Sequence, residues 1–229
     1  MQRISIIVPA LNEAAGIVAT LAALQSLRAA GHEVIVVDGG STDGTGERAR
    51  AAADRVIFAP RGSAAQMNAG AALARGDILL FLHADTRLPG NADALVLHRM
   101  GASGRAWGRF DVGIEGKSRL LPLIAFGMNL RSRTTGIATG DQAIFVRRAA
   151  FVQAGSFPTI ALMEDIALSR ALKRISPPLC LSEKVLTSGR RWESRGVLRT
   201  VLLMAWLRLQ FFFGAAPARL ARLYDGERG

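Results

Sequence analysis

The stretch D-I-L-L-F-L-H-A-D-T-R-L-P, residues 77–89, decides the fold that the sequence predicts. Its apolar run, Ile78 to Leu82, is followed directly by His83, Ala84 and Asp85. This is the pattern of a buried strand that ends in polar side chains. Ligands of open α/β sheets bind at the carboxyl ends of the strands. We therefore expect His83, Ala84 and Asp85 to face a ligand.

The chain before this stretch alternates between strand and helix patterns. Apolar runs at residues 4–8, 34–37 and 55–59 predict strands, and residues 12–28, a segment ending at 54, and residues 64–74 predict helices. This alternation predicts a parallel, doubly wound sheet whose loops meet at one edge. Beyond residue 89 the pattern is looser, with helices at 91–100 and 164–174, strands at 107–114 and 138–146, and an apolar segment at 120–130.

Composition limits the class of protein. The chain has 229 residues, half of them hydrophobic, which is enough for one large domain with a buried core. The single Cys180 excludes an intrachain disulfide and a cysteine-based zinc site. Residues 1–116 carry 11 Lys and Arg against 11 Asp and Glu, whereas residues 117–229 carry 18 against 7. The net charge of +11 therefore lies in the second half and favours an anionic partner there.

We expect that partner to be membrane phosphate, and not nucleic acid, because no nucleic-acid-binding module pattern appears. The N-terminus leads straight into the run at 4–8 without a signal-peptide pattern, so we expect a cytoplasmic chain, peripheral on the inner face of the cytoplasmic membrane.

The apolar tail at 197–213 is too short and too interrupted to predict a spanning helix, which needs about 20 apolar residues. Arg199 and Gln210 fall on one side of a helical wheel and Arg208 on the other, so the tail is not a simple amphipathic helix. We expect residues 193–229 to form a helical extension. Three docking partners stay open for it: the domain itself, a second subunit in a homodimer, and a membrane.

Several motifs together resemble those of the inverting family 2 glycosyltransferases of GT-A fold. They are I-I-V-P-A-L-N-E, V-V-D-G-G-S-T-D-G-T, G-S-A-A-Q-M-N-A-G, L-H-A-D-T and a later E-D before a helix. The chain looks most similar to small bacterial transferases associated with radical-SAM and selenodomain proteins, in which G-D-Q-A-I-F-V-R-R and W-L-R-L-Q-F-F-F-G also have counterparts.

The resemblance implies an α/β Rossmann-like fold with a mixed, mostly parallel sheet flanked by helices. It implies a transferase domain at 1–192, divided into a nucleotide-sugar-binding half at 1–90 and an acceptor half at 91–192. The helical extension at 193–229 follows.

The resemblance also implies a nucleoside-diphosphate-sugar donor, with a UDP-sugar favoured. Asp38 matches the aspartate that binds the base, and Asp85 matches the metal-binding acid of a D-X-D element whose first acid is His83 here. Mn²⁺ or Mg²⁺ is the implied cofactor, since both ions bind carboxylate, water and phosphate oxygens. Three roles stay open for His83: a ribose contact, a metal ligand, and a core histidine. The implied donor contacts are Pro9, Ala10, Asn12, Glu13, Asp38, Gly39, Ser41, Asp43, Arg61, Gly62, Asn68, His83 and Ala84.

Asp165 matches the general base that takes the proton of the acceptor hydroxyl. Glu164, beside it on a helix, is expected to face elsewhere and to cap or orient. The alternative for both acids is a helix N-terminus that the dipole favours. The acceptor and diphosphate side is expected at Asp141, Gln142, Glu164, Arg191 and Trp192. Many relatives that synthesise polymers carry a Q-X-X-R-W element. Here Arg191 and Trp192 match its last two residues, but Ser188 stands in place of the glutamine, so single-sugar transfer is favoured over polymer synthesis.

Two other functions remain open, and the acceptor is not identified. A non-catalytic nucleotide-sugar-binding or membrane-associated protein is suggested by His83 and by the missing glutamine. A nucleotidyltransferase is less favoured, because it would bring a glycine- and lysine- or arginine-rich triphosphate loop where this chain has Ala10-Leu11-Asn12-Glu13.

Overall fold

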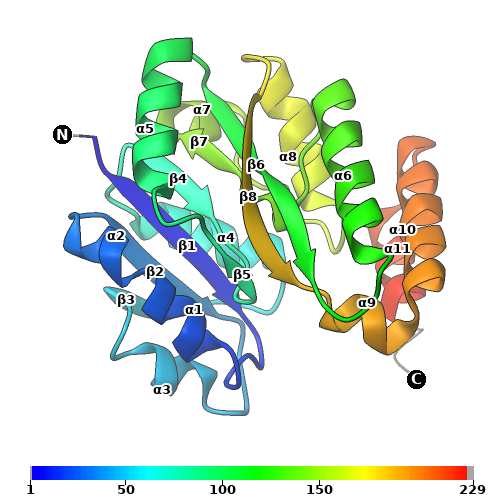
Figure 1. Cartoon of the computed structure of the whole chain (residues 1–229), viewed down its shortest axis with the longest axis horizontal. Coiled ribbons are helices and arrows are strands. Elements are labelled where there is room, and N and C mark those ends of the chain that lie inside the picture. The colour runs from blue at the N-terminus through cyan, green and yellow to red at the C-terminus, as the bar shows by residue number, and fades with distance from the viewer. Residues whose placement is uncertain (1, 226–229) are drawn as a thin grey trace.

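The computed structural model describes residues 2–225, apart from the side chains of Arg191, Arg195 and Asp225. It shows one mixed sheet with helices packed on both faces (Figure 1). The strands run in the spatial order β3-β2-β1-β4-β7-β6-β8-β5. Their bounds are β1 Ile4–Ala10, β2 Glu33–Asp38, β3 Arg55–Phe58, β4 Ile78–Phe81, β5 Thr86–Arg87, β6 Trp107–Glu115, β7 Phe145–Arg147 and β8 Leu179–Ser188.

Two helical groups cover the sheet. The helices in chain order are α1 Ile17–Ala23, α2 Gln25–Ala29, α3 Thr45–Ala49, α4 Ser63–Leu73, α5 Ala92–Ser103, α6 Leu121–Thr135, the 3₁₀ turn η1 Gly140–Gln142, α7 Arg148–Gln153, α8 Glu164–Lys173, α9 Arg190–Arg195, α10 Val197–Phe212 and α11 Pro217–Asp225. Buried residues of α1, α2, α5 and α6 pack on one face of the sheet, and those of α4, α7 and α8 pack on the other.

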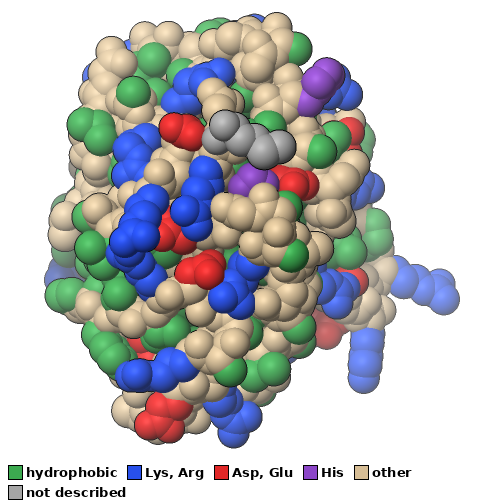
Figure 2. Space-filling model, turned by 90° about the vertical axis from the view of Figure 1, so that its left-hand side faces the viewer, with side chains coloured by type: hydrophobic (Ala, Val, Ile, Leu, Met, Phe, Trp, Pro, Cys, Tyr) green, Lys and Arg blue, Asp and Glu red, His purple; other side chains and the backbone are tan. Residues whose placement is uncertain are grey.

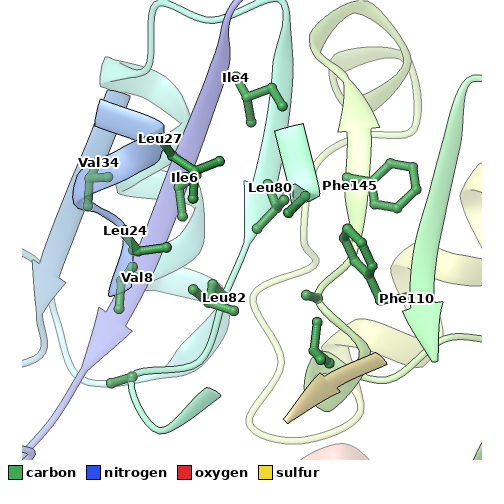
Figure 3. Close-up of a cluster of buried hydrophobic side chains, with 14 of the residues drawn as sticks. Ile4, Ile6, Val8, Leu24, Leu27, Val34, Leu80, Leu82, Phe110 and Phe145 are labelled. Atoms are coloured by element: carbon green, nitrogen blue, oxygen red, sulfur yellow. The ribbon is translucent and has the colours of Figure 1, made fainter. Parts of the chain in front are cut away.

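Alternation along the strands separates the two cores. Ile4, Ile6 and Val8 of β1 point to the first face, whereas Ile7 points to the second, because successive strand residues face opposite sides. Figure 3 shows the first core, in which Leu24 and Leu27 of α2 and its preceding turn meet the side chains of β1. Strands buried on both faces explain the near-continuous apolar runs in the sequence.

The first four strands confirm the expected parallel arrangement, since β1 pairs in parallel with β2 and β4, and β2 with β3. The second half mixes directions: β7 is antiparallel to both β4 and β6, whereas β6 and β8 are parallel. The mixed, mostly parallel α/β sheet flanked by helices is therefore confirmed.

Three local expectations were wrong. The helix expected at 12–28 begins only at Ile17, because Asn12 adopts a left-handed conformation (φ 54°) in the loop after β1. The helix expected to end at residue 54 is shorter, because α3 already ends at Ala49. The strand expected at 138–146 is replaced by η1 and the shorter β7, because Ala143 is also left-handed (φ 45°) and breaks the extended run. The structure adds α7 and β8, which the sequence patterns did not predict.

The segment after residue 189 forms α9, α10 and α11 beside α6 (Figure 1). Within residues 2–225, no helix combines the length and the hydropathy needed to cross a membrane. On the opposite side of the molecule, near α2 and α3, Lys and Arg side chains lie among Asp and Glu side chains (Figure 2). This mixture agrees with the balanced charge of residues 1–116.

The turn that enters β4 gives a test of packing. We expect Gly76→Ala to destabilise the fold by about 1–3 kcal/mol, because overpacking of a tight site has this magnitude. A Cβ at Gly76 would lie 2.6 Å from the Ser5 nitrogen and 2.7 Å from the Arg3 oxygen, both backbone atoms of β1 or its entry. Urea denaturation of the purified variant measures the change.

The matched control is Gly101→Ala in α5, where an added Cβ has nothing within 4 Å. That change should stabilise the protein by about 0.5–1 kcal/mol, because alanine is the better helix former. Equal stability of the two variants would show that the contact at Gly76 is not tight.

Candidate active site

A cavity of about 540 Å³ opens at the carboxyl ends of the central strands. Its size is typical of small-molecule sites, which span about 300–1,000 Å³. The loop after β1, the end of β4, η1, the start of α8, and α10 all contribute to its lining. The cavity therefore joins the two halves of the sequence at the sheet edge that the strand patterns indicated.

Side chains tie the loop after β1 to the loop after β2. The Ser41 hydroxyl accepts a hydrogen bond from the Asn12 N–H (2.9 Å), and the Asn12 side-chain oxygen accepts one from the Thr42 N–H (3.0 Å). Asp43 accepts the Ala14 N–H (3.0 Å). Pro9, Ala10, Asn12 and Glu13 line the cavity, whereas Ser41 and Asp43 are not among its lining residues. The polar residues of the second loop therefore fix the first loop in place.

Asp38 lies beneath this pair of loops and not on the cavity wall. Its side chain is buried, and its Oδ1 accepts the N–H groups of Gly40 (3.0 Å) and Ser41 (2.7 Å). Gly39 packs against Gln66, whose amide donates to the carbonyls of Ala10 (2.9 Å) and Val37 (2.8 Å). Within the structure, Asp38 and Gly39 shape the loop that the cavity abuts.

The expected residues around α4 divide into two groups. Arg61 lines the cavity and is exposed, and Gly62 borders a smaller neighbouring recess. Asn68 does not line the cavity. Its side chain donates to the Phe157 carbonyl (2.8 Å) and accepts the Phe157 N–H (3.1 Å). Asn68 thus anchors the chain segment that precedes α8, and its expected contact with the donor stays a prediction.

The end of β4 delivers its polar side chains to the cavity, as the opening stretch predicted. His83, Ala84 and Asp85 all line it. His83 Nδ1 lies 3.3 Å from Asp141 Oδ1, and the ring packs on Gly140, where any Cβ would collide with it. His83 is about one-third exposed, so it is not a core histidine.

The residues at the end of β4 could hold a divalent metal only if a bound substrate or water supplied further ligands. No cluster of three or more His, Cys, Asp or Glu suited to a metal occurs in the described part of the chain. Asp85 faces the cavity, and the hydrogen bond that its carboxyl accepts from the described residues is a long one, 3.4 Å from the Thr86 hydroxyl. Mg²⁺ binds through one or two carboxylates together with waters and substrate phosphates. One available carboxylate fits that mode.

Asp165 stands at the start of α8 with both carboxylate oxygens engaged by backbone. Oδ2 accepts the Gly140 N–H (2.9 Å), and Oδ1 accepts the Ile166 N–H (2.7 Å). Burial raises the pKa of Asp165 above its usual range, and the charge of Arg208 acts in the opposite direction. A buried carboxylate with a raised pKa is a functional-site candidate, because it holds a proton more readily than an exposed one.

Glu164 also lines the cavity, beside Asp165. The cavity wraps around the first turn of α8, which Met163 opens in a left-handed conformation (φ 70°), and both acids reach it. Burial and the neighbouring Asp165 charge raise the pKa of Glu164, whereas a hydrogen bond from the Ser63 side chain lowers it.

The remaining acceptor-side expectations have mixed outcomes. Asp141 and Trp192 line the cavity. Gln142 does not line the cavity: it is fully buried, and its side chain donates a hydrogen bond to Asn129 (3.3 Å) beneath η1. The side chain of Arg191 lies outside the described residues. Its neighbour Arg190 reaches Glu13 of the loop after β1 (3.3 Å), which ties α9 to the cavity rim.

Sequence reasoning missed the contribution of the helical extension. Thr200, Met204 and Arg208 of α10 and Tyr224 of α11 all line the cavity. The one available signal was Arg208, which falls opposite Arg199 and Gln210 on the helical wheel of an otherwise apolar segment.

Comparison with known proteins assigns the first two thirds of the chain. The family model described as "Glycosyl transferase family 2" matches residues 5–152. Among curated proteins, no significant sequence match was found.

Solved structures share the fold at low sequence identity. They include S. aureus TarS 1–349 in complex with UDP-GlcNAc (20% identity, TM-score 0.65, covering 82% of this chain and 59% of that one). The mannosyltransferase PcManGT from Pyrobaculum calidifontis, in complex with GDP-Man and Mn²⁺, matches at 21% identity and TM-score 0.67 (99% and 69%). Glucosyl-3-phosphoglycerate synthase from Mycobacterium tuberculosis, with Mn²⁺, UDP and phosphoglyceric acid, matches at 22% and 0.60 (80% and 68%). The present chain spans about 60% of the length of TarS 1–349.

The raised pKa of Glu164 predicts a pH-dependent stability difference. The folded protein holds this proton more tightly than the unfolded chain, so wild-type stability should fall as pH rises above the ordinary value of 4.5 through the raised pKa. Glu164→Gln cannot ionise and escapes this loss. Thermal unfolding from pH 4 to pH 8 should therefore show the variant gaining on wild type as pH rises.

The control is Glu47→Gln, the same substitution at an exposed acid in α3. It shows how far a Glu→Gln substitution outside the cavity changes the pH dependence. If the difference between Glu164→Gln and wild type does not change with pH, the Glu164 carboxylate is not buried at a cost in the native state.

Proposed function

Because this chain belongs to glycosyl transferase family 2, we propose that it moves one sugar from a nucleoside-diphosphate-sugar to an acceptor hydroxyl, with inversion at the anomeric carbon. Family membership makes the chain a glycosyltransferase and not a nucleotidyltransferase. The observation that carries the finer proposal is a single cavity that holds Asp85 at the end of β4 and the half-buried Asp165 at the start of α8. The narrower likeness to radical-SAM-associated transferases stays a prediction.

The donor is proposed to bind at the loops after β1 and β4. TarS binds UDP-GlcNAc, PcManGT binds GDP-Man with Mn²⁺, and the synthase binds UDP with Mn²⁺. Two of these three complexes contain a uridine nucleotide, which favours a UDP-sugar. Pro9, Ala10 and Asn12 offer the base and ribose a rigid wall, because Ser41 and Asp43 hold the loop from behind.

Asp85 is proposed to hold Mn²⁺ or Mg²⁺ together with the donor diphosphate, and His83 borders the same place. Such an ion would supply positive charge that offsets the charge developing on the departing diphosphate. His83 is also held by Asp141, so its ring has a fixed direction toward the cavity.

Asp165 is proposed as the base for the acceptor hydroxyl. Its backbone hydrogen bonds fix the carboxylate, and its raised pKa strengthens it as a proton acceptor. Trp192 lies on the same cavity wall and offers an apolar surface to a sugar ring. The role expected for Arg191 at the diphosphate stays a prediction.

Two substitutions separate donor binding from transfer. Asp85→Ala should reduce metal-dependent donor affinity at least tenfold, because it removes the cavity carboxylate closest to the proposed metal. Asp165→Asn should keep donor affinity within about twofold yet lower transfer by 10²-fold or more, the range of a lost general base. The readouts are thermal shift with nucleotide-sugars, with and without Mn²⁺, and donor turnover.

Asp93→Asn, which changes an acid on α5 that pairs with His32 and does not line the cavity, is the control for loss of negative charge. Near-normal turnover in Asp165→Asn would exclude it as the base. Unchanged donor affinity in Asp85→Ala with metal present would exclude the metal role. Donor binding without turnover in wild type would support the non-catalytic alternative.

The outer surface of the extension supports a second part of the proposal, an anionic membrane as partner. On α10, Thr200, Met204 and Arg208 face the cavity, whereas an apolar stripe faces outward. The stripe, which we call the α10 stripe, consists of Leu198, Leu202, Trp206, Leu209, Phe212 and Phe213, which are 43–74% exposed. Because α10 also buries Leu207 on its inner side, the helix is apolar on both sides, whereas an ordinary surface helix exposes a polar side.

Helix α6, which lies next to α10 (Figure 1), exposes Leu123, Phe126 and Leu130 by 50–66%. Exposed basic side chains occur on the same elements, with Arg199 on α10, Arg219 and Arg222 on α11, and Arg119 just before α6. Apolar and basic residues together match an anionic lipid surface. A homodimer through α10 would bring two copies of a chain with net charge +11 together, which repulsion disfavours.

Vesicle flotation tests the membrane partner. We expect wild type to float with vesicles containing phosphatidylglycerol, to bind less at high salt, and to bind poorly to vesicles of phosphatidylcholine alone. The double variant Leu202→Ser/Phe212→Ser should lose most of this binding, whereas Val152→Ser, an equally exposed apolar residue on α7, should not. A dimer in solution that the double variant dissolves, without vesicle binding, would assign the α10 stripe to a second subunit instead.

A further inference from the structure

Two arginines meet beside Asp165, at the end of the cavity formed by the extension. Arg208 of α10 lines the cavity. Arg131 of α6 is not a lining residue, but Arg208 exerts the largest charge effect on it, followed by Asp165 and Asp141. The two guanidinium groups therefore lie near each other and near the same two acids.

Several of their N–H groups are buried without a partner. Within residues 2–225, the Nε of Arg208 and the Nε and Nη2 of Arg131 have no hydrogen-bond acceptor and almost no solvent contact. Buried donors in folded proteins nearly always have a partner, so each exception asks for an explanation such as a missing ligand. Arginine is also the residue type least suited to remain buried and unpaired.

The neighbouring acids do not supply this partner. Both Asp165 oxygens accept backbone N–H groups, from Gly140 and from Ile166. Asp141 pairs with His83. Burial lowers the pKa of Arg131 to about 10 and also lowers that of Arg208, which shows that attraction to the acids does not offset the loss of water. This end of the cavity therefore has buried hydrogen-bond donors to spare.

We infer that Arg208, reinforced by Arg131, forms a subsite for a phosphate group on the acceptor. The planar fork of a guanidinium matches phosphate oxygens, and two neighbouring cations match a group that carries about −1.5 to −2 charge. The inference rests on the proposed glycosyltransferase function. It deepens that function by naming the acceptor class: a molecule with both a hydroxyl and a phosphate.

The position favours the acceptor over the donor diphosphate. The acids that act on Arg208 are Asp165, the proposed base for the acceptor hydroxyl, and Asp141. The donor loops after β1 and β2 are tied to each other through Asp43, whose charge is not among those that act on Arg208. A phosphate at Arg208 would leave a hydroxyl of the same molecule within reach of Asp165.

Two sources would carry this chemistry, a soluble phosphorylated molecule and a lipid phosphate. Arg208 projects into the cavity from the same helix whose other side is the α10 stripe. A lipid phosphate would therefore reach the subsite from a surface on which the helix already lies. The two sources differ in whether an alkyl chain adds affinity.

Thermal unfolding in the presence of inorganic phosphate tests the subsite. The protein is first saturated with UDP and Mg²⁺, so that phosphate has no access to the donor site. We expect a saturable rise of the unfolding midpoint with phosphate, and a loss of phosphate affinity of at least tenfold in Arg208→Gln and in Arg131→Gln. Arg208→Lys keeps the positive charge but not the planar guanidinium, so its phosphate affinity should fall less than that of Arg208→Gln.

Arg50→Gln, at an exposed arginine beside α3, controls for net charge and should bind phosphate as wild type does. UDP affinity should be unchanged in all variants. Without phosphate, Arg208→Gln should unfold no earlier than wild type, because it removes a half-buried guanidinium whose Nε has no acceptor; a merely structural arginine would lower the midpoint. Repeating the titration with dodecyl phosphate below its critical micelle concentration separates the sources: tighter binding assigns a lipid, and equal binding a soluble acceptor.

The inference is overturned if phosphate gives no saturable rise, if Arg208→Gln binds phosphate as tightly as wild type, or if UDP competes with phosphate. Competition would place both arginines at the donor diphosphate. Failure of UDP to bind wild type would contradict the proposed donor alone, since the phosphate titration without UDP still reports on the two arginines.

Discussion

The carboxylate of Asp165, held between two backbone N–H groups, is the constraint that organises the cavity. A carboxylate can stay buried only where donors replace the water that it loses. One donor is the N–H of Ile166 at the start of α8. The other is the N–H of Gly140 in η1, which lies 25 residues earlier in the chain. Gly140 cannot carry a side chain, because His83 at the end of β4 packs against it. One buried charge therefore fixes α8, η1 and β4 relative to one another.

The extension completes this arrangement and gives it an outward face. Arg208 of α10 adds a second cation beside Asp165, next to Arg131 of α6. The inner side of α10 lines the cavity with Thr200 and Met204, and its Leu207 packs against Met163, Ile166 and Leu220. The α10 stripe lies on the other side of the same helix, where it stays exposed. In the proposed reaction, the same helix contacts both acceptor and membrane.

The sequence predicted the first half of the fold better than the second for a physical reason. Strands β1, β2 and β4 are buried on both faces, so they appear as unbroken apolar runs that end in polar loops. Strand β8 is only half-buried and carries Glu183 and Lys184, so its pattern is weak. Likewise, the left-handed turn at Ala143, which ends the expected strand at 138–146, leaves no trace in the residue types.

The sequence also placed some of the expected site residues at the cavity and not others. His83, Asp85, Asp141, Glu164 and Asp165 reach the cavity because each follows a strand or begins a helix at the sheet edge. Asn68 and Gln142 lie in equally convincing motifs, yet their amides bond to neighbouring segments, Asn68 to the backbone of Phe157 and Gln142 to the side chain of Asn129. Whether an amide binds a ligand or a loop depends on partners far along the chain. Residue type and spacing alone do not decide it.

The division of charge along the chain follows from the two substrates of the proposed reaction. The donor half is electrically balanced, and its contributions to the cavity include the acids Glu13 and Asp85. A diphosphate bound beside carboxylates needs a cation from outside the chain, which is the part proposed for the metal. The rest of the chain carries its own cations, and two of them, Arg131 of α6 and Arg208 of α10, lie half-buried beside the proposed base. An acceptor phosphate needs no metal there, because Arg208 and Arg131 already supply the charge.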